Sequence, residues 1–114
     1  MFQIKIVDHF DAAHHLPNFP GKCQQVHGHT FLVTLILEGS VLKDGILVDF
    51  GEVKSWLKSI LDNRFDHRDL NDVLEMPTAE LIAKMIYDTI KIVFPMLKSV
   101  SVKEGEGGEA SYIE

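Results

Sequence analysis

The sequence VHGHTFLVTLILE, residues 26–38, decides the fold because it predicts the longest strand of the chain. Its β-branched and aromatic residues favour a pleated, half-buried surface, and the turn Gly39-Ser40 ends it. Side chains alternate between the two faces of a strand, so His27 and His29 project to the same side. The strand therefore defines the sheet and, on it, a pair of converging imidazoles.

Shorter strands are expected on either side of this one. Alternating apolar residues at the start of the chain predict a strand over residues 2–10, followed by an irregular loop over residues 15–22 with two prolines and a glycine. The apolar run at residues 46–48 predicts a short third strand. Two more are expected over residues 99–104 and 110–113, separated by the glycine-rich turn GEGG.

Two helices are expected in the middle of the chain, where the apolar period changes after Gly51. Asp49 is the expected cap of the first helix, and the second begins near Thr78 and stops before Pro95. Their predicted apolar faces are Val53, Trp56, Leu57, Ile60 and Leu61 in the first helix and Leu81, Ile82, Met85, Ile86, Ile90 and Val93 in the second. The order β-β-β-α-α-β-β predicts an α+β domain, an antiparallel sheet with two helices on one face.

Composition limits the classes of protein to consider. A chain of 114 residues allows one domain, residues 1–114, and its apolar stretches are shorter than the roughly 18 residues of a membrane span. A net charge of −6 argues against a nucleic-acid surface. The first residues lack the features of a secretory signal and the single cysteine cannot form an internal disulfide, so we expect a cytoplasmic location. Uncovered sheet edges favour an oligomer.

A third histidine can complete a metal site. His14 lies at the end of the first strand, which can pair with the strand that carries His27 and His29. Three imidazoles around Zn²⁺ leave a fourth position open for water or substrate, as in catalytic zinc sites, although iron, cobalt and nickel also bind imidazole. The alternative for each histidine is an exposed or hydrogen-bonded ring, and this is the interpretation we keep for His9 and His15.

The only thiol of the chain is close to these histidines. Cys23 follows Lys22, and a neighbouring cation favours the reactive thiolate form of a cysteine. Cys23 is therefore a candidate zinc ligand, nucleophile or proton acceptor, or else a small side chain that fills a loop.

Two acidic features remain. Asp66 beside His67 can orient an imidazole for acid–base catalysis, but Asp-His is also common in capping turns, and Asp69 and Asn71 look like turn residues. Glu104 ends a strand on the face expected to be buried, where a ligand with two parallel N–H donors would satisfy its carboxylate. The alternative for Glu104 is a solvated strand end.

Together these pieces resemble the 6-pyruvoyl-tetrahydropterin synthases and the related QueD-type 6-carboxy-tetrahydropterin synthases. The matching stretches, in family order, are FDAAHHLP, KCQQVHGHTF, GILVDFGEVK, FDHRDLND, PTAE and VKE. They cover nearly the whole chain, and their ordered set is far more specific than any one of them. The resemblance implies the tunnelling fold, in which trimers close a barrel of strands and two trimers usually stack as a hexamer.

The resemblance also implies roles for particular residues. The positions that match are His14, His27 and His29 for the zinc ligands, Cys23 for the catalytic thiol, Asp66 and His67 for a pair usually reached across a subunit boundary, and Glu104 for the carboxylate that anchors the pterin. Lys22 is the one obvious cation near the site for a triphosphate. Gly105 stands where the family commonly has threonine, His15 where arginine is frequent and Phe65 where leucine is frequent.

The implied activity is that of a zinc-dependent carbon-oxygen lyase. The family's substrate is 7,8-dihydroneopterin triphosphate, and a QueD-type enzyme converts it to 6-carboxy-5,6,7,8-tetrahydropterin, acetaldehyde and triphosphate on the way to 7-deazaguanines such as queuosine. Compact size and short loops favour this branch over the one that makes 6-pyruvoyl-tetrahydropterin. A hydroxymethyl-producing branch carries a glutamate before HGH, where this chain has Gln24 and Gln25 and retains Cys23. A non-catalytic pterin- or metal-binding protein is the remaining alternative.

Overall fold

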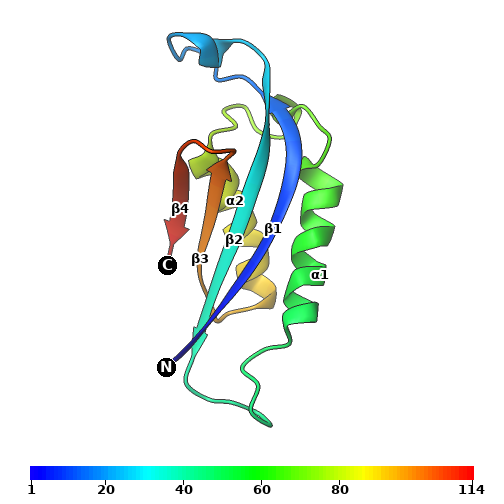
Figure 1. The fold of residues 1–114 in the computed structure, drawn as a ribbon, viewed down its shortest axis with the longest axis vertical. Helices are drawn as coiled ribbons and strands as arrows, with labels where there is room; N and C mark the ends of the chain where they lie inside the picture. The colour runs from blue at the N-terminus through cyan, green and yellow to red at the C-terminus, as the bar shows by residue number, and fades with distance from the viewer.

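The computed structural model describes all of residues 1–114 as a four-stranded antiparallel sheet and two α-helices (Figure 1). The elements are β1 (Phe2–His14), β2 (His27–Gly39), α1 (Phe50–Ile60), α2 (Ala79–Val93), β3 (Leu97–Glu104) and β4 (Glu109–Ile113). Short helical turns cover Lys22–Gln24 (η1), Leu61–Phe65 (η2) and Leu70–Asp72 (η3). The strands follow the order β1-β2-β3-β4 across the sheet, so each pairs with its neighbour in sequence. The predicted α+β class is confirmed.

The core lies between the helices and one face of the sheet. On β2 every second residue from Phe31 onward is fully buried: Phe31, Val33, Leu35 and Leu37. On the helices the buried residues recur at helical spacing: Val53, Leu57 and Ile60 on α1, and Ile82, Ala83, Ile86, Tyr87 and Ile90 on α2. Period-two burial on the strand and helical period on the helices confirm that both helices cover the same face.

Both helices begin where the sequence predicts. The Asp49 carboxylate accepts a hydrogen bond from the Gly51 N–H at 2.8 Å, and the Thr78 hydroxyl accepts one from the Leu81 N–H at 3.2 Å. Such caps satisfy backbone donors that have no partner inside the helix. The predicted apolar faces are too wide, because Trp56 and Leu81 are each 43% exposed. Neither helix has the length and apolar character that crossing a membrane requires.

The predicted third strand at residues 46–48 is wrong. Lys43 and Ile46 exchange both backbone hydrogen bonds, at 2.9 and 3.0 Å, and between them Asp44 and Gly45 have φ values of 53° and 80°. Two consecutive residues with positive φ make a tight reversal that matches strand twist without extending into a sheet. Residues 46–48 instead line a cavity of about 250 Å³. Phe2, at the start of β1, lines the same cavity.

β1 is longer than predicted and runs to His14 rather than ending near Phe10. The extension follows from tertiary pairing, since Ala12 lies opposite His29 and His14 opposite His27 on β2. Beyond this pairing, residues 15–26 form a loop that projects past the end of the sheet (Figure 1). The end of β1 and the start of β2 therefore place His14, His27 and His29 at the base of this loop.

Candidate active site

Three imidazoles meet at the loop end of the β1–β2 pair. His14 and His27 are paired across the two strands, and His29 lies two residues further along on the same face. The ring centroids are 4.5 Å apart for His14 and His27, 5.2 Å for His14 and His29, and 4.8 Å for His27 and His29. One ring nitrogen from each histidine lies within 4.8 Å of the other two. The structure thus brings together the three predicted metal ligands.

Backbone carbonyls orient two of these rings. The Nδ1 of His14 is 2.9 Å from the carbonyl oxygen of Pro77, and the Nδ1 of His27 is 2.8 Å from that of Gln25. A carbonyl only accepts, so each Nδ1 carries the proton and each Nε2 is left with a free lone pair. A backbone contact of this kind is the usual support of a metal-binding imidazole.

Two ring nitrogens in the cluster are buried without a partner. They are the Nε2 atoms of His14, whose side chain is fully buried, and of His29. Buried polar atoms are rarely left unpaired, so nitrogens without a protein partner that face one another fit a site that binds a metal ion. The donor set fits a divalent ion such as Zn²⁺, which binds neutral imidazole.

The environment of His29 favours the neutral ring that a metal requires. Burial lowers the pKa of His29, and this effect outweighs the opposing influence of Glu104, whose Oε2 lies 3.8 Å from the His29 Nε2. The other two imidazoles of the cluster lower the pKa of His29 further. A metal ion can therefore bind His29 without first displacing a proton over the neutral pH range.

A cavity of about 590 Å³ opens beside the histidines. Its lining residues are Lys22, Cys23, Gln25, Val26, His27, His29 and Glu104. Cys23 belongs to η1 and is half-buried, and its carbonyl accepts a hydrogen bond from the Leu16 N–H at 2.6 Å, which closes the base of the loop. The predicted thiol, cation and anchoring carboxylate therefore share one cavity with two of the metal ligands.

Glu104 ends β3 and is half-buried, with its side chain 27% exposed. The sequence predicts a buried carboxylate there. In the structure Glu104 lines three cavities. Besides the 590 Å³ cavity, Glu104 lines one of about 480 Å³ together with Phe19 and one of about 260 Å³ together with Glu109. A carboxylate in this position can accept hydrogen bonds from a ligand in these cavities.

Asp66 and His67 form a close pair at the outer edge of β1, as the sequence predicts. The Asp66 Oδ2 is 2.9 Å from the His67 Nδ1, while the Asp66 Oδ1 accepts a hydrogen bond from the Asp11 N–H at 2.9 Å. The hydrogen bond donated by the Asp11 N–H, followed by that donated by His67, lowers the pKa of Asp66, and donating to the Asp66 carboxylate raises the pKa of His67. The aspartate thus stays ionised and makes the imidazole a stronger base.

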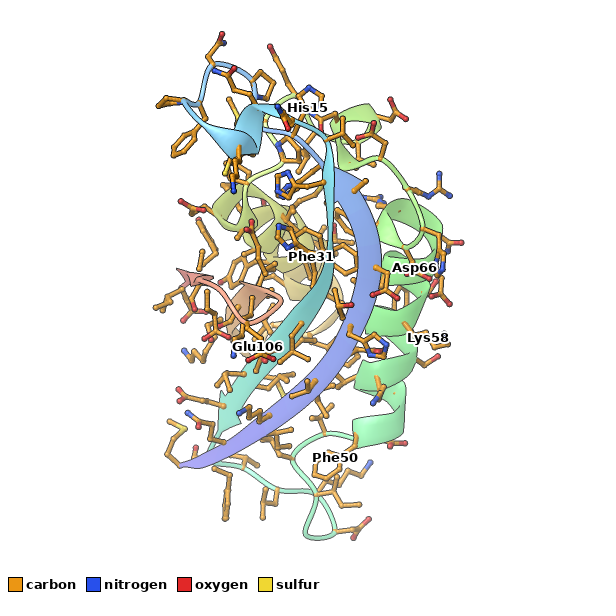
Figure 2. All side chains as sticks on the ribbon, turned by 45° about the horizontal axis from the view of Figure 1, so that its top comes forward. His15, Phe31, Phe50, Lys58, Asp66 and Glu106 are labelled. Atoms are coloured by element: carbon orange, nitrogen blue, oxygen red, sulfur yellow. The ribbon has the colours of Figure 1, made fainter.

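This pair does not join the other predicted residues within one chain. Figure 2 shows Asp66 between β1 and α1, and the His67 side chain is 78% exposed. Neither residue lines the cavity of Cys23 and His29. The structure of one chain therefore separates this pair from the cavity that holds the other predicted site residues.

Sequence reasoning missed the groups that orient the histidines. The carbonyls of Pro77 and Gln25 belong to residue types with no chemical signal, so no sequence pattern identifies them. Asp69 and Asn71 are turn residues as predicted, since Asn71 lies in the η3 turn and the Asp69 Oδ1 caps that turn by accepting the Asn71 N–H at 3.0 Å. The Asn71 side chain also contacts the backbone of His15, and this further contact has no signal in the sequence.

Comparison with known proteins places this chain in one family. The family model for 6-pyruvoyl tetrahydropterin synthase matches residues 3–114. A Synechocystis sp. protein named 6-carboxy-5,6,7,8-tetrahydropterin synthase is 38% identical over 111 residues, covering 90% of this chain and 86% of the relative. A Pyrococcus furiosus protein named dihydroneopterin monophosphate aldolase is 35% identical over 99 residues, covering 84% and 83%. The structure of Caenorhabditis elegans 6-pyruvoyl tetrahydropterin synthase superposes with a TM-score of 0.87 at 26% identity, covering 99% and 95%.

The fold is thus the tunnelling fold of pterin-processing lyases, as the sequence resemblance implies. The chain belongs to the 6-pyruvoyl tetrahydropterin synthase family.

Proposed function

We propose that the protein is a zinc-dependent 6-carboxy-5,6,7,8-tetrahydropterin synthase that acts on 7,8-dihydroneopterin triphosphate. The observation that carries the proposal is the single cavity in which Cys23 and Glu104 lie beside the histidine cluster. Identity of 38% over most of the chain to a relative with this name supports the choice of activity. The single cysteine fits work in a reducing compartment such as the cytoplasm.

His14, His27 and His29 would hold the metal. Two of them already present Nε2, and the unpaired buried nitrogens of His14 and His29 fit the ion. Zinc bound there would supply a Lewis acid that polarises the side-chain hydroxyls of the pterin substrate.

Protein groups around this centre would bind the substrate and move its protons. Glu104 accepts hydrogen bonds from the amino group and ring N–H of the pterin, which holds the ring at the end of β3. Cys23, as the thiolate, accepts a carbon-bound proton from the substrate side chain. Lys22 lines the same cavity and provides positive charge for the triphosphate. Breaking the C–O bond to triphosphate and shifting the side-chain protons oxidises the side-chain carbons to carbonyls while the pterin ring takes up the two electrons. A water molecule then adds to the carbonyl carbon next to the ring, the bond from that carbon to the rest of the side chain breaks, and acetaldehyde leaves the 6-carboxy group behind.

The Asp66–His67 pair would act from a neighbouring subunit. Asp66 fixes the imidazole through a 2.9 Å contact and raises the pKa of His67, which suits a group that exchanges protons with substrate oxygens near neutral pH. Because the pair lies at the edge of β1, outside the cavity of its own chain, we propose a homo-oligomer, a trimer or hexamer, with active sites at subunit interfaces.

Incubation of the zinc-loaded protein with 7,8-dihydroneopterin triphosphate tests the activity. Mass spectrometry of the pterin product is expected to find the 6-carboxy compound. A 6-pyruvoyl product would instead assign the biopterin branch, and a hydroxymethyl product would assign the chemistry suggested by the name of the Pyrococcus relative. Unchanged substrate would leave a pterin- or metal-binding protein and overturn the proposal.

A pair of variants tests the shared site. Cys23→Ala is expected to abolish turnover while zinc content stays unchanged, and His67→Ala to do the same from the other side of the interface. The two variants are then mixed and their subunits allowed to exchange. If Cys23 and His67 act in one site from different chains, some mixed sites combine an intact cysteine with an intact histidine, and activity is restored. No recovery, despite proven subunit exchange, would place both residues in the site of a single chain.

A further inference from the structure

Asn71 forms a clamp on the backbone of His15. Its Oδ1 accepts a hydrogen bond from the His15 N–H at 2.9 Å, and its Nδ2 donates one to the His15 carbonyl at 3.0 Å. The two residues are 56 positions apart in sequence, so the contact joins distant segments. One carboxamide thus pairs with the donor and the acceptor of a single residue, as a neighbouring strand would.

The clamp fixes the backbone immediately after the predicted metal ligand His14, at the end of β1. The β1–β2 pairing ends at His14 opposite His27, and His15 is the first residue beyond it, labelled at the base of the projecting loop in Figure 2. The next residue, Leu16, donates its N–H to the carbonyl of Cys23 at 2.6 Å. The position of His15 therefore influences a metal ligand on one side and the base of the cysteine loop on the other.

Asn71 is itself held firmly. Its N–H is bound by Asp69, and the neighbouring Leu70 is fully buried in the core. Just before it in sequence, the Arg68 carbonyl accepts a hydrogen bond from the Ala13 N–H at 3.0 Å. The segment from Arg68 to Asn71 thus runs along the edge of β1 and continues its hydrogen bonding one residue past the end of the sheet.

We propose that Asn71 is a positioning residue for the metal centre. By fixing the backbone of His15 it holds the His14 imidazole where the Pro77 carbonyl can orient it, and it anchors the loop that carries Cys23. Only a carboxamide of this length offers one acceptor and one donor to the same peptide segment. The inference rests on the proposed metal site.

Zinc affinity of the folded protein is the appropriate readout, measured at 20 °C by competition with a chromophoric chelator. Asn71→Ala removes both hydrogen bonds, and Asn71→Leu removes them while filling the space of the side chain, so that a packing defect in one variant does not decide the result. Loss of a direct partner of a ligating side chain typically weakens metal binding by 10- to 100-fold, and because Asn71 acts through the backbone next to His14 we expect the lower end, about tenfold, for both variants. Circular dichroism verifies that each variant is folded under these conditions.

Two control variants make the result specific. Gln3→Ala removes an exposed amide that donates to Glu38, and Asn63→Ala removes an exposed amide that donates to Ser59. Both are expected to bind zinc within about twofold of the original chain. A merely structural role for Asn71 would lower the unfolding temperature of the metal-free protein without changing the zinc affinity of the folded state.

The outcomes separate the two proposals. If the original chain binds zinc tightly and folded Asn71→Leu or Asn71→Ala binds it equally well, the positioning role is wrong and the metal site stands. If the original chain itself binds no zinc, the proposed metal centre fails and this inference fails with it.

Discussion

His14 and His27 are direct partners in the antiparallel pairing of β1 with β2, and their ring centroids lie 4.5 Å apart. The fully buried His14 therefore rests on the sheet rather than on a mobile loop. A site built on regular elements holds its geometry more precisely than one built on loops. The hydrogen bonds of the strands thus preorganise the proposed ligands before any metal binds.

Removing one of these imidazoles is expected to abolish stable metal binding. His27→Ala leaves two ligands, and the zinc content after dialysis should fall from about one ion per chain to nearly none. His9→Ala is the matched control, since His9 lies on the same strand as His14 but points to the opposite, exposed face. Atomic absorption spectroscopy measures both. Full zinc content in His27→Ala would show that the ion binds elsewhere.

The charge of Asp66 is expected to control the titration of His67. The hydrogen bond that His67 donates to the Asp66 carboxylate raises the pKa of His67 above 6.5, so Asp66→Asn should move that pKa back towards 6.5. Because the pKa of His67 is raised in the folded state, the pair stabilises the fold while His67 is protonated and Asp66 is ionised, and this contribution is lost as the pH rises through the folded pKa of His67. It is also lost as the pH falls through the lowered pKa of Asp66. NMR titration of the His67 ring measures the shift.

The control for this titration is Asp88→Asn, which removes an exposed carboxylate paired with Lys84 on α2. It should leave the His67 titration unchanged. An unaltered His67 pKa in Asp66→Asn would mean that the 2.9 Å contact is not maintained in solution.

Much of the fold could be predicted because its helix starts and strand faces depend on residues that are close together in sequence. The caps at Asp49 and Thr78 depend only on nearby backbone N–H groups, and the burial of alternate residues on β2 follows from strand geometry. The failure at residues 46–48 has a local cause, since Asp44-Gly45 with positive φ turns the chain back at once. Three apolar residues cannot by themselves distinguish a strand from a packed turn.

Side-chain chemistry identifies the candidate site residues in the sequence, but it does not identify the backbone groups that orient them. Histidine, cysteine and paired aspartate–histidine are visible as residue types, and strand alternation predicts that His27 and His29 converge. The carbonyl of Pro77 becomes a partner of His14 only through a tertiary contact across 63 positions. Asn71 was assigned to a turn because asparagine favours turns, and only the fold shows that its amide reaches His15.

Glu104 is expected to determine pterin affinity without supporting the fold. Glu104→Gln keeps the shape of the side chain but replaces an acceptor-only carboxylate by an amide, which cannot accept two N–H groups equally well. Hydrogen bonds to a charged group contribute about 1.5–3 kcal/mol, so the dissociation constant of a pterin such as neopterin should rise at least tenfold. Isothermal titration calorimetry measures the change.

The matched control is Glu106→Gln, which alters an exposed glutamate in the adjoining turn, labelled in Figure 2. Its pterin affinity should equal that of the original chain. Equal affinity in Glu104→Gln would remove this carboxylate from the pterin site.

Aromatic packing beneath the histidines is expected to dominate stability. Phe10 stacks on Phe31 with ring centroids 4.8 Å apart and also contacts Phe65, and Phe10 is 1% exposed. Phe10→Ala should lower the free energy of unfolding by about 3–5 kcal/mol, because it removes a buried ring and leaves a cavity. Phe50→Ala, at a side chain that is 62% exposed, should change it by about 0.5 kcal/mol or less. Urea unfolding of the metal-free chains at one protein concentration measures both, and equal midpoints would show that the Phe10–Phe31 stack is not part of the stabilising core.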